Sequence, residues 1–150
     1  MEKTVYLGSD HAGFELKEFL KLYLTKKGHV VKDLGATKYN KNDDYPIYAA
    51  KVAHAVAKQK SQGILFCGSA QGMCITANKI KGVRAVTPNT VSEARLTRQH
   101  NDSNVLCLSG WNLSTHEAAK IVEVWLRTKF SNDARHVRRV KQIQSIEKSR

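Results

Sequence analysis

The sequence predicts an α/β fold: a single Rossmann-like domain with a five-stranded parallel sheet and helices on both faces. Short apolar runs alternate with segments whose apolar residues recur at helical spacing, and this alternation is typical of a parallel sheet covered on both sides. The length of 150 residues also fits one domain. We therefore expect residues 1–150 to form one domain, with strand order 2-1-3-4-5.

The first part of the chain contains two of these strands and two helices. An apolar run at residues 5–7 predicts the first strand. Residues 16–24 carry apolar side chains at the spacing of one helix face. A second short strand is expected at residues 30–34, followed by a polar loop over 35–44. Residues 46–58 are predicted to be a helix, because proline is favoured in the first helical turn.

Three further strands follow, each with an apolar core. Residues 63–67 form a continuous apolar run that is typical of a buried strand. A helix is expected at residues 72–80, a fourth strand at 83–86 and a fifth at 105–108. Each strand is thus followed by a helix, as the alternation requires.

Two capping boxes mark the helices on either side of the fifth strand. Thr90 is followed three residues later by Glu93, and Ser114 in the same way by Glu117. Each pair predicts a helix start. Apolar residues on a narrower stripe over 137–146 indicate a final helix.

The composition restricts the partners of the protein. The chain has 25 Lys and Arg against 13 Asp and Glu, a net charge of +12, and much of this excess lies near the C-terminus. That segment lacks interleaved aromatic residues and a helix-turn-helix pattern, so we do not expect nucleic-acid binding. No apolar run is long enough to span a membrane, and the N-terminus lacks the apolar core of a signal peptide. We expect a cytoplasmic protein with no membrane partner.

The cysteines do not form a framework. The chain has an odd number of cysteines, Cys67, Cys74 and Cys107, and no two of them form a C-x-x-C motif. Neither a disulfide scaffold nor a zinc site is therefore expected. Cys74 and Cys107 are interpreted as buried small apolar residues. Cys67 differs, because it lies where a strand ends and a helix begins. Such a place lowers the pKa of a thiol, which predicts a nucleophile or a general base.

Polar residues follow the predicted strands at the edge where parallel sheets bind ligands. Asp10 and His11 come after the first strand, and a turn of small residues, Gly68 to Gly72, comes after the third. Such a turn lets backbone N–H groups approach an anion. His100 precedes the fifth strand and reaches this edge only through folding. Asp10 and His11 alone also fit a helix-capping pair, and with His100 they also fit a metal site.

These segments together resemble the ribose/galactose phosphate isomerase family, and within it the ribose-5-phosphate isomerase B branch. The resemblance covers nearly the whole chain, and its motifs are specific as a set. They are, in order, Gly8-Ser9-Asp10-His11-Ala12-Gly13-Phe14-Glu15-Leu16-Lys17, Asp44-Tyr45-Pro46, Cys67-Gly68-Ser69-Ala70-Gln71-Gly72, Ala77-Asn78-Lys79, Gly82-Val83-Arg84-Ala85, Arg98-Gln99-His100-Asn101-Asp102 and Arg135-His136-x-x-Arg139.

The resemblance implies an aldose–ketose isomerase that interconverts ribose 5-phosphate and ribulose 5-phosphate without a metal or an organic cofactor. It makes Cys67 the base that forms an enediolate, and His100 the residue that opens the sugar ring with Asp10 nearby. It also implies sites that lie between the subunits of a homodimer, with a tetramer also open. The remaining residues implied are Ser69 in catalysis, Gly68, Ala70 and Gly72 in the oxyanion turn, Tyr45 and Asn101 as sugar contacts, and His11, Arg135 and Arg139 as phosphate ligands.

Two positions depart from the family pattern. Ala70 stands where the family usually has glycine, which matters if the backbone there needs a positive φ. The run Ser109-Gly110-Trp111-Asn112 lacks the arginine that the family usually carries after the fifth strand. These departures leave open an isomerase of another aldose or aldose 6-phosphate. A non-catalytic sugar-phosphate or nucleic-acid binder on the same fold is the alternative from another class.

Overall fold

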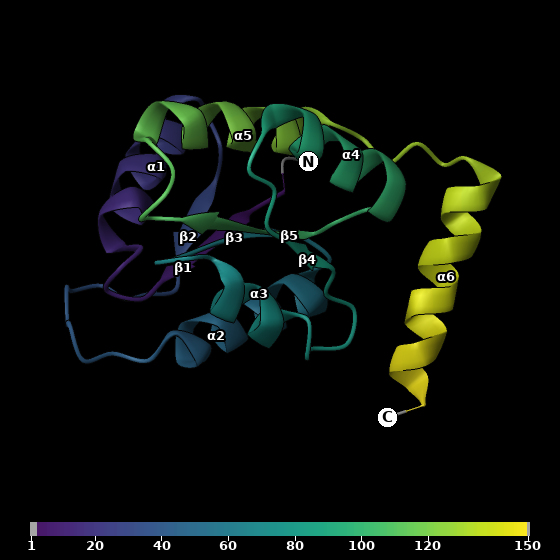
Figure 1. Ribbon diagram of the computed structural model, residues 1–150, viewed down its shortest axis with the longest axis horizontal. Coiled ribbons are helices and arrows are strands. Elements are labelled where there is room, and N and C mark those ends of the chain that lie inside the picture. The colour runs from purple at the N-terminus through teal and green to yellow at the C-terminus, as the bar shows by residue number, and fades with distance from the viewer. Residues whose placement is uncertain (1–2, 150) are drawn as a thin grey trace.

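The computed structural model describes residues 3–149 and has a parallel sheet between two layers of helices (Figure 1). It confirms the predicted α/β architecture. The strands are β1 (Val5–Ser9), β2 (Val31–Asp33), β3 (Gln62–Cys67), β4 (Ala85–Val86) and β5 (Val105–Ser109). The helices are α1 (Phe14–Lys26), α2 (Tyr45–Gln59), α3 (Gln71–Ala77), α4 (Val91–Asn101), α5 (Thr115–Arg127) and α6 (Ala134–Lys148).

Each face of the sheet packs against its own group of helices. Helices α1, α4 and α5 cover one face, and α2 and α3 cover the other (Figure 1). The alternation along β3 divides the core, because Ile64 and Phe66 face the first group whereas Leu65 and Cys67 face the second. The thiol of Cys67 therefore lies on the side of α3, the short helix that follows it.

The strand order is β2-β1-β3-β5-β4, so the predicted order 2-1-3-4-5 is wrong in its last two places. The fifth strand is fully buried and pairs with β3 from Gly63 opposite Val105 to Cys67 opposite Ser109. The fourth has two residues and, within residues 3–149, pairs only with β5. A short strand suits the edge of a sheet because it leaves few backbone N–H and C=O groups unpaired there. A continuous apolar strand instead needs a neighbouring strand on each side.

The predicted helix starts are present with one difference. Ser114 and Glu117 form the complete capping box. The hydroxyl of Thr90 accepts the Glu93 N–H at 3.1 Å, but the carboxylate of Glu93 accepts from the N–H of Asn89 instead of Thr90.

Among residues 3–149, no helix has the length and apolar character needed to cross a membrane.

Helix α6 stands apart from the sheet and its two layers (Figure 1). It packs against α4 near its start, and close to its other end the carboxylate of Glu147 accepts the N–H of Gly82 at 3.0 Å. Two large apolar side chains of this helix, Ile143 and Ile146, remain exposed. An apolar stripe left open by its own chain is typical of a surface that a partner covers.

Candidate active site

A cavity of about 180 Å³ lies at the carboxyl ends of β1, β3 and β5. Strands β1 and β3 are neighbours although β2 lies between them in the sequence, so this is the point where the chain reverses its direction across the sheet. Ligands bind at such points in open α/β sheets. The cavity is lined by Asp10, His11, Ala12, Tyr45, Cys67, Gly68, Ser69, Gly72 and Trp111.

A larger cavity of about 620 Å³ lies at the opposite edge, among the amino ends of the strands. Its guanidinium groups on Arg84 and Arg98 are already paired with the carboxylate of Asp102, at 3.2 and 3.0 Å. It contains none of the residues that the sequence predicts for the site, so the smaller cavity is the candidate active site.

Cys67 ends β3 and is 4% exposed. Backbone N–H groups of Ser69, Ala70 and Met73 point at its sulfur and favour the thiolate. Burial outweighs them, and with the negative charge of Asp10 it raises the pKa of Cys67 above its ordinary value. The expected lowering of this pKa is therefore wrong: the helix end contributes as predicted, but desolvation of the charged sulfur is the larger effect.

The turn after Cys67 has the backbone conformation that makes Ala70 unusual. Ala70 lies in the left-handed region, with φ of 70°, and is fully buried. A residue with a Cβ is strained there by about 1 kcal/mol relative to glycine. With the backbone in this conformation, N–H groups of the turn are directed at the sulfur. Ser69 lines the cavity, and its hydroxyl accepts the N–H of Gln71 at 3.4 Å.

Asp10 also lines the cavity and comes directly after β1, the strand next to β3. It is 6% exposed, and its carboxylate accepts the N–H of Gly13 at 3.1 Å. Within the described residues, helix α1 has no side-chain capping hydrogen bond at its start, so the capping interpretation of Asp10 and His11 is wrong. Burial, with a contribution from the charge of Asp43, raises the pKa of Asp10. A carboxyl group with a raised pKa beside a buried thiol is the kind of pair that active sites use for proton transfer.

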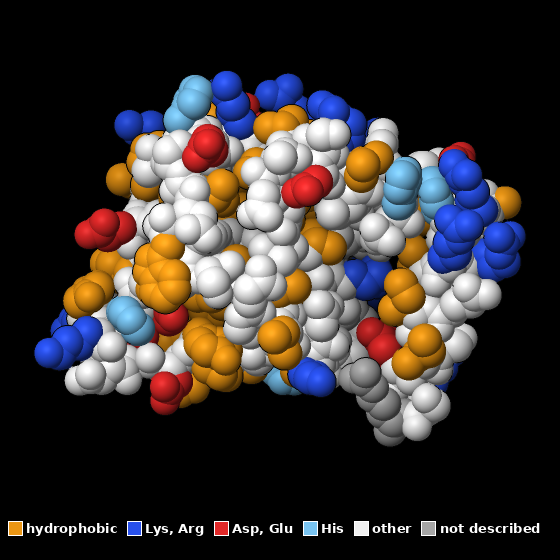
Figure 2. Space-filling model, viewed as in Figure 1, with side chains coloured by type: hydrophobic (Ala, Val, Ile, Leu, Met, Phe, Trp, Pro, Cys, Tyr) orange, Lys and Arg blue, Asp and Glu red, His pale blue; other side chains and the backbone are white. Residues whose placement is uncertain are grey.

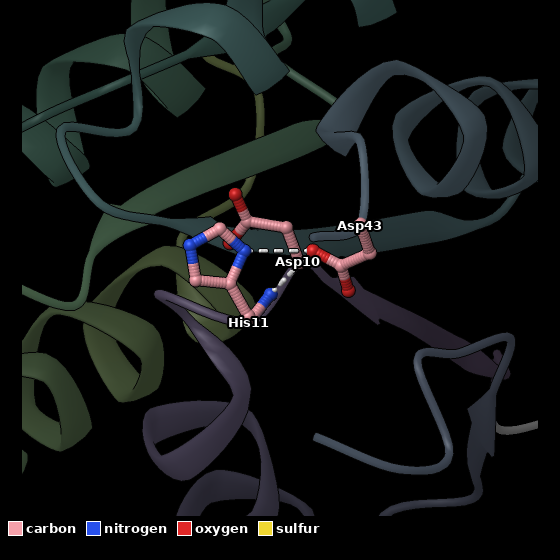
Figure 3. A group of neighbouring side chains, drawn as sticks. All are labelled: Asp10, His11 and Asp43. Carbon is pink, nitrogen blue, oxygen red and sulfur yellow. Dashed lines mark hydrogen bonds and ion pairs between the residues drawn. The ribbon is translucent and has the colours of Figure 1, made fainter. Parts of the chain in front are cut away.

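His11 is held by a residue that the sequence analysis missed. Asp43 accepts hydrogen bonds from the backbone N–H of His11 at 3.0 Å and from its Nδ1 at 2.8 Å (Figure 3). Asp10, His11 and Asp43 place one possible metal ligand each within 4.8 Å of one another. The metal site considered from the sequence combined Asp10 and His11 with His100, whereas the structure brings Asp43 to them in its place. Asp43 is 32 positions from His11, and no periodicity connects them.

Two aromatic rings cover glycines at the rim of the cavity. A Cβ on Gly72 would lie 2.5 Å from the ring of Tyr45, and one on Gly68 would lie 2.5 Å from the ring of Trp111. The hydroxyl of Ser109 donates to the carbonyl of Gly68 at 2.5 Å, which fixes the loop that carries Trp111. Trp111 is 72% exposed, so most of its ring faces outward at the mouth of the cavity.

The remaining predicted residues gather elsewhere, where α4 ends beside the start of α6. The rings of His100 and His136 lie 4.4 Å apart, and burial, followed by the positive charges of His100 and Arg135, lowers the pKa of His136. Figure 2 shows histidine rings beside a group of Lys and Arg side chains at this end of α6. Arg139 and Asn101 are exposed here too. The structure therefore divides the predicted site into two groups.

Comparisons with known proteins agree on one family. A family model described as Ribose/Galactose Isomerase matches residues 5–143. Ribose-5-phosphate isomerase B of Escherichia coli K12 is 41% identical over 149 residues, covering 99% of both chains, and a probable ribose-5-phosphate isomerase B of Mycoplasma genitalium is 41% identical over 150 residues, covering 99% of this chain and 98% of that one. The crystal structure of the M. genitalium isomerase with bound ribulose-5-phosphate superposes with a TM-score of 0.94 at 40% identity, covering 98% of this chain and 97% of that chain.

Proposed function

The chain belongs to the ribose/galactose isomerase family and is a sugar-phosphate isomerase, and we propose that its reaction is the interconversion of ribose 5-phosphate and ribulose 5-phosphate. The observation that carries this proposal is that the buried thiol of Cys67 and the carboxyl group of Asp10 line one small cavity at the strand ends. In the proposal residues 1–150 act as one isomerase domain; residues 1, 2 and 150 lie outside the described part of the chain.

The chemistry moves two protons. The thiolate of Cys67 takes the proton from C2 of the open-chain aldose and leaves an enediolate, and the thiol then returns that proton to C1. A second proton moves from O2 to O1, which completes the ketose. Backbone N–H groups of the turn after Cys67, including those of Ser69 and Ala70, stabilise the negative oxygen. Gly68 and Gly72 let the rings of Trp111 and Tyr45 approach this turn closely.

The group at α4 and α6 acts on the sugar ring and on the phosphate together with Asp10 and His11 of the cavity. We assign ring opening to His100 with Asp10, a sugar contact to Asn101, and phosphate binding to His11, Arg135 and Arg139. The guanidinium groups of Arg135 and Arg139 have no acidic partner among the described residues, so both can bind an anion. Arginine binds phosphate well because its planar group donates two parallel hydrogen bonds.

These two groups belong to one site if two copies of the chain pair. In a homodimer with twofold symmetry, the group at α4 and α6 of one protomer faces the cavity of its partner, and the reverse. The exposed apolar residues on α6 support this arrangement, because a second copy would cover them. A tetramer would be a pair of such dimers.

A mixed dimer tests the shared site. The Cys67→Ala and His100→Asn variants are each expected to be inactive as homodimers. A mixed dimer, purified through two different tags, has one site in which intact Cys67 meets intact His100, so it should recover about half of the wild-type activity. If the mixed dimer is no more active than its parents, each site is built from a single chain and the dimer proposal is wrong.

A panel of sugars tests the substrate. Trp111 stands at the cavity mouth where the family pattern has a cation, and this favours testing longer sugars as a second candidate. With ribose 5-phosphate, allose 6-phosphate and free ribose, we expect kcat/KM for ribose 5-phosphate to exceed that for free ribose by more than about tenfold, because a charged hydrogen bond is worth at least that much. Equal turnover of free ribose would contradict phosphate recognition, and faster turnover of allose 6-phosphate would favour the second candidate.

A further inference from the structure

The His11 imidazole is held by one oxygen of a buried carboxylate from a distant loop. Oδ1 of Asp43 accepts both the backbone N–H and the ring Nδ1 of His11. The Asp43 side chain is 5% exposed, whereas that of His11 is 32% exposed. Figure 3 shows the two side chains meeting edge to edge, with the second ring nitrogen of His11 on the side away from Asp43. The second ring nitrogen, Nε2, has no hydrogen bond to any described residue and lies beside the cavity that His11 lines.

The direction of this hydrogen bond follows from the chemistry of its acceptor. An ionised carboxylate only accepts, so Nδ1 of His11 must carry a hydrogen. A phosphate dianion also only accepts. It can therefore bind the second nitrogen, Nε2, only when that nitrogen carries a hydrogen as well. A histidine fixed in this way presents its Nε2 to the phosphate with its ring orientation already set.

The other oxygen of Asp43 indicates that this arrangement costs stability. Oδ2 is buried, and within the described residues it has no hydrogen-bond partner. In Figure 3 it points away from the imidazole. A buried, half-satisfied carboxylate lowers stability, and such local costs are concentrated at functional sites. The backbone N–H of Asp43 donates to the carbonyl of Asn40 at 3.1 Å, so the loop itself holds the carboxylate in place.

We propose that Asp43 is a positioning residue that orients the His11 imidazole toward the phosphate group of the substrate and thereby sets the affinity for that group. The inference rests on the proposed function, in which His11 is a phosphate ligand. Asp43 acts only through His11 and does not touch the substrate. A cation held by Asp10, His11 and Asp43 is a different use of the same atoms, and the experiment below distinguishes it.

The test compares Asp43→Ala, Asp43→Asn and His11→Asn with the Asp43→Ala/His11→Asn double variant. Asp43→Ala should raise KM for ribose 5-phosphate and Ki for inorganic phosphate by about tenfold, with kcat little changed, because binding rather than chemistry loses a hydrogen bond. Asp43→Asn keeps an acceptor oxygen and should restore most of the affinity. In the His11→Asn background, removing Asp43 should have no further effect on either constant. Asp44→Asn is the matched control, because Asp44 is exposed and its side chain makes no capping hydrogen bond.

Each outcome decides the proposal. If Asp43→Ala weakens phosphate binding equally with and without His11, or lowers kcat and the melting temperature with no change in KM, Asp43 is structural and the proposal fails. Loss of activity on chelation with EDTA, restored by Zn²⁺, would replace it with a cation site. Inorganic phosphate can be titrated by calorimetry whether or not the protein turns over ribose 5-phosphate, so failure of the proposed function is seen separately.

Discussion

Cys67→Ala is expected to lower kcat by about 10²–10⁴-fold while the Kd for ribulose 5-phosphate stays within about threefold of wild type. The thiolate acts on the proton between C1 and C2, whereas affinity comes from the phosphate contacts. Stopped assays in both directions give kcat, and calorimetry with the inactive variant gives Kd. Removing one buried sulfur should cost about 1 kcal/mol of stability, which a thermal melt can check.

Cys74→Ala is the matched control, because Cys74 is half-buried and lies outside the cavity. It should keep wild-type kcat. Retention of most activity in Cys67→Ala, with normal folding, would falsify the role of Cys67 as the base. The pH profile is a second check: burial raises the pKa of Cys67, and the base is the deprotonated form, so kcat/KM should rise as pH increases from neutral toward that pKa. A rate that falls over this range contradicts a thiolate base.

Arg135→Ala and Arg139→Ala should each raise KM for ribose 5-phosphate by about 10–150-fold, because a charge-assisted hydrogen bond is worth about 1.5–3 kcal/mol. Both side chains are exposed near the start of α6, so the free energy of unfolding should change by no more than about 0.5 kcal/mol. Steady-state kinetics with ribose 5-phosphate, together with chemical denaturation of each variant, measures both quantities.

Arg138→Ala provides the comparison on the same helix, since Arg138 is equally exposed and is assigned no contact with substrate. It should leave KM unchanged and so separate a specific contact from a general loss of positive charge. If Arg138→Ala raises KM as much as the other two, α6 attracts the substrate only through its net charge. Early melting of Arg135→Ala or Arg139→Ala with normal KM would make these arginines structural.

Local patterns in the sequence determined the elements and the class of fold. Each predicted strand and helix is present, with ends shifted by a few residues, because apolar periodicity and capping side chains act within one or two turns of chain. The same local logic placed Asp10 and Cys67 at the ligand edge of the sheet, since parallel strands bring their carboxyl ends together. It also identified the left-handed backbone at Ala70 as the conformation to check.

The tertiary structure alone decided how these parts meet. The strand β5 lies beside β3, and not at the edge as predicted, because it is a strand whose two faces are both buried. This position brings Trp111, which follows β5, to the rim of the cavity next to Gly68. The pKa of Cys67 depends on desolvation by surrounding atoms, which outweighs the nearby backbone N–H groups. The pairing of His11 with Asp43 is equally nonlocal, because packing brings together residues that no sequence periodicity links.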